Sequence, residues 1–477
     1  MRSRTAGYPV LAVFVACSLP MFMAGLDNLV VVTSLTVIRA DLGADVAHLQ
    51  WISNAYIVAF AGLLLVAAGL GDRWGRRRVF TAGIAGFTAA SLCCGLADTA
   101  GQLIAARAVQ GAGAAMLTPL SLTILAGAVP ARSRGLAIGL WSAANGAAIS
   151  LGPLAGGAVA EGLDWRWVFW INVPIGVVAL VLARRWLPES RVRSTGVDVV
   201  GMALVCATVV AGIWAIVNGP ERGWTAPAVL VAGAVSVALA VAFVVWERRT
   251  VTPLLPPRLY RIKAFTLTNV ASLSMHFGVF GSIFLLAQLL QVAHGYGPLD
   301  AGLRTMAWTV MPMIVAPLAG MLTQRIGGGR LIAAGLALQA AGLAWIAAVA
   351  APAQPFAEIL GPMVTAGIGM GLVFAPTAAV VLAAVRSEEH GLASGANTTV
   401  REFGGALGIA VLGTVFQAHG GYGDPQRFVD GVVAALWVGA PVVVAGAVVA
   451  LFIPRGAGSV EPTIPPGDDA RPAVHSA

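Results

Sequence analysis

Residues 69–78 read Gly-Leu-Gly-Asp-Arg-Trp-Gly-Arg-Arg-Arg and lie between two long apolar runs. Four positive charges in so short a loop resist translocation across a bilayer, so the loop is expected on the cytoplasmic side. Its three glycines permit a tight turn and a close approach of helices. Asp72 lies where neighbouring arginines and a helix N-terminus would stabilise a carboxylate. Taken alone, the stretch also fits an ordinary basic loop between two membrane helices, and the rest of the chain has to separate these interpretations.

The amino-acid composition is that of a membrane protein. Of the 477 residues, 58% are hydrophobic and only 10% are charged, whereas about 25% charged residues is usual for a soluble domain. Apolar runs longer than about 18 residues, enough for a helix to cross a bilayer, recur along the chain. Only helices and closed barrels satisfy their backbone groups inside lipid. The predicted fold class is therefore an all-α polytopic protein embedded in the lipid bilayer.

Charge and cysteine usage exclude several classes of function. The net charge of +8 comes from arginines in alternate loops rather than from one basic stripe, which argues against a nucleic-acid partner. Lys263 is the only lysine and lies outside any Gly-Lys-Ser/Thr sequence, so no phosphate loop for ATP is present. The four cysteines fall in apolar runs without the spacing of a zinc site or a disulfide framework. No cofactor and no metal are predicted.

Windows of about 20 apolar residues predict fourteen membrane spans. The predicted spans are 10–35, 51–70, 79–97, 101–128, 135–160, 167–187, 197–217, 227–246, 264–292, 298–323, 330–350, 358–384, 391–417 and 431–453. An even number of spans places both termini on the same side of the membrane.

The distribution of arginine and lysine tests both the number of spans and their orientation. With the N-terminus inside, the inside segments hold 22 of the 29 basic residues. A missing or an additional span would scramble this alternation. The excess predicts fourteen spans and cytoplasmic termini in a cytoplasmic membrane. The other seven are Arg39, Arg166, Arg222 and Arg427 in outside loops and Arg107, Arg304 and Arg401 within spans.

A weak internal repeat divides the chain. The sequence from Ala68 to Gly75 is echoed from Gly320 to Gly327, with three of eight positions identical. The copies follow spans 2 and 10, a shift of eight, whereas two six-helix halves alone would give a shift of six. The simplest explanation is an inserted pair of helices between two six-helix bundles. The predicted domains are an N-terminal bundle at 1–187, a linker with the inserted pair at 188–263, a C-terminal bundle at 264–453 and a disordered tail at 454–477.

Asp27 and Arg107 are the first functional candidates, because a charge inside a membrane span is costly and is retained for a reason. Asp27 lies about 12 Å from the outer end of its span, and Arg107 lies about 9 Å from the outer end of its own. At similar depth the two would pair if their helices are neighbours, which offsets much of the cost of burial. The pair would be either a static link between helices or a switch that takes up a proton when a conformational change loosens it.

Arg401 and Glu402 lie about 15 Å into span 13, near the middle of the bilayer. Adjacent residues on a helix point about 100° apart, so the two need not pair with each other. One of them would face a cavity, and Glu402 is a second candidate site for a proton or a cation. His276, alone on its span, is predicted to be a packed core residue rather than a member of a relay. Arg304 is predicted to cap the outer end of span 10 with Asp300.

Taken together, these stretches resemble the major facilitator superfamily, specifically its fourteen-spanner drug:proton antiporters, from about residue 10 to residue 453. Residues 69–78 resemble the family's loop between helices 2 and 3, although Ala68 replaces the usual preceding glycine and Gln324 replaces the acid in the second copy. The other matching stretches are Leu26–Val32 in helix 1, Leu103–Gly113 in helix 4, Gly152–Gly157 in helix 5 and Asp164–Pro174 before helix 6.

The resemblance implies two bundles that rock around a central cavity, and the export of amphipathic drugs or specialised metabolites by a monomer in exchange for protons. It also places Asp72 against the start of span 13, around Gly391–Gly395, in the outward-open state. The charges inside the spans, rather than the resemblance, predict Asp27, Arg107, Arg401 and Glu402 for proton coupling, and Glu402 is a carboxylate that the family pattern does not lead one to expect. The resemblance adds Gly71, Asp72, Arg73, Gly75 and Arg76 in the gating loop, and Gln110, Gly111, Gly152, Pro153, Gly156 and Gly157 in the helix-4 and helix-5 motifs.

Other functions stay open at this point. The chain could export a single native metabolite, or it could be an uptake symporter, against which the glycine-proline motif of helix 5 argues. A membrane acyltransferase would use His419 and Asp424, which have the His-x4-Asp spacing but lie on a glycine-rich outer loop without a second catalytic cluster. A secondary active transporter rather than an enzyme is the predicted class, and its substrate is not named by the sequence.

Overall fold

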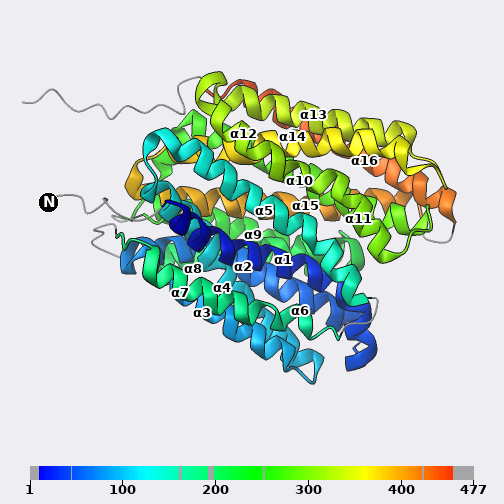
Figure 1. Cartoon of the computed structure of the whole chain (residues 1–477), viewed down its shortest axis with the longest axis horizontal. Coiled ribbons are helices and arrows are strands. Elements are labelled where there is room, and N and C mark those ends of the chain that lie inside the picture. The colour runs from blue at the N-terminus through cyan, green and yellow to red at the C-terminus, as the bar shows by residue number, and fades with distance from the viewer. Residues whose placement is uncertain are drawn as a thin grey trace, which may run out of the picture.

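The computed structural model describes residues 10–44, 46–160, 164–191, 198–250, 253–421 and 424–454, so the tail predicted to be disordered lies outside it beyond residue 454. The described chain forms helices and no strand (Figure 1). The first helices are α1 Val10–Leu42, α2 Val46–Trp74, α3 Arg76–Gly95, α4 Ala100–Ala128, α5 Ala131–Ala160, α6 Trp167–Trp170, α7 Asn172–Trp186, α8 Val199–Arg222 and α9 Pro227–Glu247. After the 3-10 helix η1 Pro257–Arg261 come α10 Lys263–Val292, α11 Pro298–Thr309, α12 Met311–Ile326, α13 Gly328–Val349, α14 Phe356–Ala383, the 3-10 helix η2 Ser387–Glu389, α15 His390–His419 and α16 Pro425–Leu451.

Each predicted span coincides with one helix or with two consecutive helices. In the described chain, 13 helices are long and apolar enough to cross a membrane, with α6–α7 and α11–α12 each taken as one. α5 adds a helix of 30 residues, which is about 45 Å long and packs against α1 and α12. The chain is a multi-pass membrane protein.

The two divided spans break just before prolines. Pro174 and Pro312 have no backbone N–H, so each leaves the carbonyl four residues upstream without its helical partner. These carbonyls belong to Trp170, at the end of α6, and to Trp308, near the end of α11. Hydropathy averages over a whole window and therefore did not detect these local interruptions.

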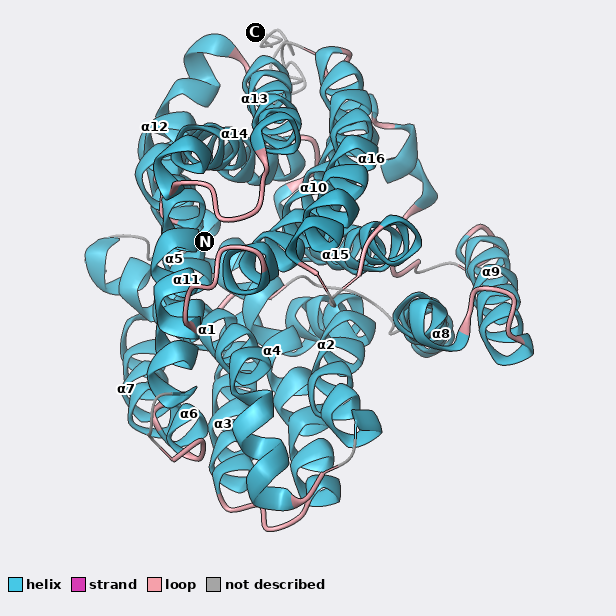
Figure 2. Cartoon of the chain, turned by 90° about the vertical axis from the view of Figure 1, so that its right-hand side faces the viewer, coloured by secondary structure: helices cyan, strands magenta, loops and turns pink. Residues whose placement is uncertain are grey.

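The helices form two bundles with a pair of helices beside them. We call α1–α7 the N-bundle and α10–α16 the C-bundle, and each has its own buried core. Figure 2 shows the N-bundle below and the C-bundle above, with α8 and α9 standing to the right. α8 packs against α2 and α15, whereas α9 packs against α8. This is the architecture of two six-helix bundles with an inserted pair that the sequence predicted.

Both copies of the internal repeat end in the same kind of turn. Gly75 precedes α3 with φ 111° and ψ 125°, and Gly327 precedes α13 with φ 95° and ψ 134°. Glycine adopts such positive φ values readily because it has no Cβ. The second turn joins α12 to α13, and eight helices separate the two turns when α6–α7 and α11–α12 are each taken as one. We call the end of the molecule that carries both turns the basic end, and the opposite end the far end.

The bundles touch backbone to backbone along α5 and α12. A Cβ added at Gly135 would lie 2.6 Å from the carbonyl oxygen of Gly320, and a Cβ added at Gly139 would lie 2.7 Å from the Cα of Pro317. A Cβ added at Gly320 would in turn overlap the carbonyl oxygen of Gly135. The close approach therefore depends on the absence of side chains on both helices.

Gly320→Val is expected to destabilise the protein by about 1–3 kcal/mol, the usual cost of overpacking, because backbone atoms of α5 cannot move aside as a flexible side chain would. The melting temperature of the purified protein in detergent measures the effect. Gly86→Val is the matched control, since nothing lies within 4 Å of a Cβ at Gly86. Equal melting temperatures for the two variants would contradict this account of the interface.

Candidate functional site

Asp27 of α1 is held by three donors from other helices of the N-bundle. The Nη1 of Arg107 donates to Oδ2 at 2.5 Å, and the Nε2 of Gln110 donates to Oδ1 at 2.9 Å. The Nδ2 of Asn172 donates to the same Oδ1 at 2.7 Å. The side chains of Asp27 and Arg107 are completely buried. Charge-assisted hydrogen bonds of this kind are short and strong, so this conformation holds the carboxylate away from solvent with both of its oxygens accepting hydrogen bonds.

Ser91 of α3 connects two of these donors. Its Oγ accepts from Gln110 Nε2 at 3.2 Å and from Asn172 Nδ2 at 3.0 Å, and its hydroxyl donates to the carbonyl oxygen of Phe169 at 2.9 Å. The network therefore joins α1, α3, α4 and α7 and ends on the backbone of α6. We call Asp27, Ser91, Arg107, Gln110 and Asn172 the Asp27 network.

Arg107 has partners besides the carboxylate. It donates to Gln110 Oε1 at 2.7 Å and to the carbonyl oxygen of Ile52 at 3.3 Å. Its guanidinium lies over the ring of Tyr56, 4.2 Å from the centroid, which is the geometry of a cation–π interaction. The positive charge thus remains partly compensated when Asp27 is neutral.

Sequence reasoning identified only part of this network. It placed Asp27 and Arg107 at similar depth, and the structure brings them into direct contact. Gln110 was named as a motif residue, whereas Asn172 was only quoted within a stretch and Ser91 was missed. The available signal was that both are isolated polar residues in apolar runs, where each needs a hydrogen-bond partner.

The basic loop holds a second buried ion pair. Arg76 Nε donates to Asp72 Oδ1 at 2.7 Å, and both side chains are about nine-tenths buried. Arg76 Nη2 also reaches the carbonyl oxygens of Ser387 and Glu388 in the C-bundle, at 3.4 Å each. A Cβ added at Gly391 would lie 2.8 Å from Asp72 Oδ2, so the carboxylate faces the N-terminus of α15, where the helix dipole favours negative charge.

The linker after the inserted pair is fixed at the same place. The Nη2 of Arg258 in η1 forms a close ion pair with Glu389, the residue immediately before α15. The other carboxylate oxygen of Glu389 accepts from the backbone N–H of Arg386. In the second copy of the repeat, Gln324 is exposed where the first copy has Asp72. Of the two copies of the repeat, the first therefore supplies a buried acid at the basic end, beside the separate Arg258–Glu389 pair.

Arg401 and Glu402 have different surroundings. Arg401 Nε donates to His276 Nε2 at 2.8 Å, and its guanidinium lies 5.1 Å from the ring centroid of Phe374. His276 Nδ1 is 3.0 Å from the carbonyl oxygen of Ser272, which assigns its proton to Nδ1 and leaves Nε2 as an acceptor. His276 is only 2% exposed, so the prediction that it is a packed residue is confirmed. That prediction was incomplete, because the ring also accepts a hydrogen bond that orients Arg401.

The motif glycines mark close helix contacts. A Cβ at Gly111 of α4 would lie 3.0 Å from the Cα of Tyr56 in α2, and a Cβ at Gly71 would overlap the side chain of Leu120 in α4. Gly152 and Gly156 are buried positions of α5. Pro153 and Gly157 also lie on α5, but their surroundings are outside the described part of the chain. Arg73 of the basic loop is exposed.

Charged groups at the far end serve local structure. Arg304 pairs with Asp300 at 3.1 Å, one turn away on α11, as the predicted cap requires. Asp41 accepts from the indole N–H of Trp165 and from Arg166, each at 2.9 Å. These hydrogen bonds, the one from Trp165 first, lower the pKa of Asp41. This carboxylate therefore ties the end of α1 to the start of α6.

The two residues of the acyltransferase alternative are also used locally. His419 Nδ1 contacts the carbonyl oxygen of Val415 at 3.0 Å, one turn back on α15. Asp424 caps α16 by accepting from the backbone N–H of Arg427 at 3.1 Å. Neither contact is typical of a catalytic pair.

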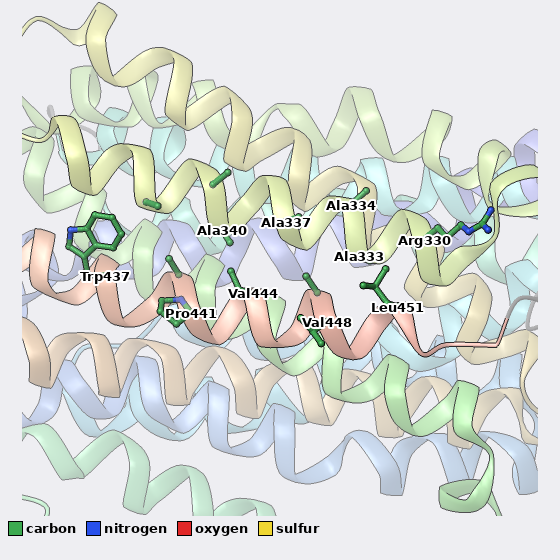
Figure 3. Close-up of a pocket in the computed structure, with 14 residues that line it drawn as sticks. Arg330, Ala333, Ala334, Ala337, Ala340, Trp437, Pro441, Val444, Val448 and Leu451 are labelled. Atoms are coloured by element: carbon green, nitrogen blue, oxygen red, sulfur yellow. The ribbon is translucent and has the colours of Figure 1, made fainter.

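One apolar groove lies away from the charged sites inside the bundles. It has a volume of about 920 Å³ and runs between α13 and α16 on the outside of the C-bundle, with Arg330 at the basic end and Trp437 towards the far end (Figure 3). Its lining between these residues is mostly alanine and valine. An apolar groove of this kind suits the acyl chains of lipid rather than a charged group.

Comparison with known proteins agrees with this architecture. The sequence profile described as Major Facilitator Superfamily matches residues 17–408 and 268–475. The cephamycin export protein CmcT of Amycolatopsis lactamdurans is 39% identical over 424 residues, which cover 87% of this chain and 86% of that protein. The multidrug resistance protein Stp of Mycobacterium tuberculosis (strain CDC 1551 / Oshkosh) is 34% identical over 86% of this chain and 76% of its own length.

A solved structure supports the fold independently of sequence. The proton:xylose symporter XylE superposes with a TM-score of 0.67 over 94% of this chain and 97% of its own, at 14% identity. So low an identity speaks for the shared fold alone. The profile match and the relatives place the chain among transporters of small molecules rather than among enzymes. The chain belongs to the Major Facilitator Superfamily.

Proposed function

We propose that this protein is a fourteen-span proton-coupled antiporter, which exports amphipathic drugs or specialised metabolites across the cytoplasmic membrane as a monomer with both termini in the cytoplasm. The observation that carries the proposal is the fully buried Asp27–Arg107 pair. A charge pair sealed inside a membrane bundle is costly to keep, and a coupling site is a reason to keep it.

The Asp27 network supplies a way to couple a proton to movement. While its three donors are in place, Asp27 stays ionised, because each donor stabilises the charged form. If rocking of the bundles loosens these contacts, the buried carboxylate loses its stabilisation and takes up a proton from the acidic outside. Release follows when the site faces the cytoplasm and the donors return. Glu402 is the second proposed proton site, with Arg401 beside it.

Alternating access is supported by the contacts at the basic end. The Asp72–Arg76 pair lies against the start of α15. α5 and α12 contact each other through backbone atoms at their glycines. Both contacts join the two bundles, so both must open when the cavity faces the cytoplasm. In the proposal, the N-bundle is 1–187, the linker with the inserted pair is 188–263 and the C-bundle is 264–453.

Export rather than uptake is supported by the relatives. One is described as an export protein and the other as a multidrug resistance protein. The first name also favours the second candidate, an exporter dedicated to one native metabolite, because it names a single class of compound. XylE is described as a symporter, but it shares only the fold with this chain.

Transport into inverted membrane vesicles tests the proposal. Vesicles that contain the protein are expected to accumulate members of a panel of cationic, neutral and anionic amphipathic compounds when the lumen is acidified. Dissipating the proton gradient should abolish the accumulation. Accumulation of one related group only would favour the dedicated exporter, and accumulation that is independent of the gradient would refute proton coupling.

Reporter fusions test the topology. A reporter fused after residue 222, at the end of α8, should read outside, and one fused after residue 458 should read inside. The physical basis is the concentration of arginines in the inside segments. Readings on the same side of the membrane for the two fusions would show that the proposed number of spans is wrong.

A further inference from the structure

Of the three arginines that the sequence places within spans, Arg401 is the one without a carboxylate partner in the described part of the chain. Arg107 pairs with Asp27 at 2.5 Å, and Arg304 pairs with Asp300 at 3.1 Å. Arg401 instead donates its Nε proton to a histidine ring. An unpaired charge inside a membrane protein is expensive and is normally compensated. The compensating anion for Arg401 is therefore to be sought outside the protein.

The surroundings of Arg401 orient its guanidinium. His276 fixes Nε through a 2.8 Å hydrogen bond, and Phe374 supports one face of the group. His276 is itself fixed by the carbonyl oxygen of Ser272 and by stacking on Phe280. With Nε occupied, the two terminal nitrogens are left as a planar pair of donors. Such a pair matches the two oxygens of a carboxylate.

Arg401 also lies at a depth in the protein that any compound crossing the membrane has to traverse. It is about 16 Å from the start of α15 and about 27 Å from its end at 1.5 Å per residue, so it is well inside the bundle. Although it is so deep, its side chain is partly exposed, as is that of Glu402. α15 packs against α2 and α4 of the N-bundle. These two helices carry Tyr56 and Arg107, whose guanidinium lies over the ring of Tyr56.

Glu402 does not form an ion pair with the guanidinium of Arg401 in the described structure. Among the described residues no ion pair within 4 Å joins Glu402 to Arg401, although the two charges interact at longer range. Their side chains leave the helix about 100° apart. Glu402 is thus free to serve as the second proton site while Arg401 binds something else.

We propose that Arg401 binds the carboxylate of the transported compound, so that the preferred substrates are amphipathic organic acids, with His276 as the residue that positions the guanidinium. Transport of such an acid rests on the proposed function, whereas its binding to Arg401 does not. The carboxylate of the bound acid pairs with Arg401, for which the described residues provide no carboxylate partner. The apolar part of the acid packs against neighbouring aromatic rings such as that of Phe374.

Equilibrium binding to the full-length protein tests the proposal. Four matched aromatic acid–amide pairs, including 1-naphthylacetic acid and 1-naphthylacetamide, are titrated against the detergent-purified protein at pH 8. For at least one pair, the wild type is expected to bind the acid about tenfold more tightly than the amide, as a charge-assisted bidentate contact allows. Arg401→Gln is expected to bind the two equally. Arg304→Gln, which alters an arginine already paired, should keep the preference.

The positioning role of His276 is separated from a structural role by its variants. His276→Leu removes the acceptor for Arg401 Nε and should reduce the acid preference to about threefold or less. His276→Gln retains an acceptor oxygen and should restore it. A purely structural role predicts that both variants bind acid and amide more weakly by the same factor.

Several results would overturn the proposal. It fails if the wild type binds no acid more tightly than its amide, or if Arg401→Gln retains the preference. If Arg401→Gln does not fold, Arg401→Lys keeps the charge without the planar pair of donors, and an undiminished preference in that variant also refutes it. The proposed function fails separately, when vesicle accumulation does not depend on a proton gradient. Gradient-driven export of neutral compounds with no acid preference refutes only the present inference.

Discussion

Asp27→Asn is expected to abolish accumulation of substrate against its gradient, while the purified variant still folds and still binds substrate. Asparagine cannot take up or release a proton, so the proposed cycle would lose the step that links the proton gradient to rocking of the bundles. Uphill transport into acidified inverted vesicles measures coupling, and equilibrium binding to the detergent-purified protein measures the rest.

The structure explains why this variant should remain folded. Removing one member of a buried ion pair usually costs about 3–5 kcal/mol, because the other charge is left without compensation. Here Arg107 keeps Gln110 Oε1, the carbonyl oxygen of Ile52 and the face of Tyr56. The asparagine oxygen can still accept from one of the remaining donors. The loss of stability should therefore be well below that range.

Asp41→Asn is the matched control for Asp27→Asn. Asp41 lies on the same helix and also pairs with an arginine, Arg166, but its side chain is 45% exposed at the far end. Coupling should be unchanged in this variant. If Asp27→Asn still concentrates substrate under a proton gradient, Asp27 is not an essential coupling acid, and Glu402 becomes the first residue to test. If it mainly loses folded protein, the pair is a static link.

Asp72→Asn is expected to reduce efflux strongly with little loss of folded protein. The change removes the charge-assisted bond from Arg76 and the favourable charge at the start of α15. Hydrogen bonds to charged groups contribute about 1.5–3 kcal/mol, which corresponds to a shift of about 10- to 100-fold between the states with the basic end closed and open. If the state with the basic end closed is populated too little, the rate of the whole transport cycle falls.

Initial rates of efflux, normalised to folded protein from size-exclusion chromatography, measure this effect. Asp98→Asn alters an exposed carboxylate at the far end, between α3 and α4, and should leave the rate unchanged. An Asp72→Asn variant with the wild-type rate would show that the basic loop does not gate transport.

The sequence predicted the helices well because a lipid environment constrains them strongly. Residues that cross a bilayer must be apolar over about 20 positions, and that signal survives without any knowledge of packing. The same averaging hid the breaks at Ile171 and Val310, which depend on single prolines. The internal repeat, in contrast, predicted the order of the bundles, because the position of Gly327 relative to Gly75 indicated an inserted pair of helices.

The site was less predictable because hydrogen-bond partners depend on which helices are neighbours. Depth along a helix follows from counting residues, so Asp27 and Arg107 could be matched in advance. Rotation about the helix axis does not follow from counting, and for that reason Asn172 and Ser91 were not assigned to the network. The contact of Arg401 with His276 joins residues 125 positions apart, and nothing local in either stretch indicates it.

The bare contact between α5 and α12 has a consequence for speed. Gly135, Gly139 and Gly320 bring main chain against main chain, so few side-chain rotamers have to change when these helices part. If long side chains interlocked here, each would have to change rotamer when the helices separate and be fixed again when they meet. Fixing one such side chain costs up to about 2 kcal/mol in conformational entropy. Here the resistance to separation comes mainly from dispersion attraction, which is weak for each atom pair and falls off smoothly. Summed over many atom pairs, this attraction holds α5 and α12 together. Because no long side chains interlock at these glycines, we expect only a low kinetic barrier to separation of the two helices.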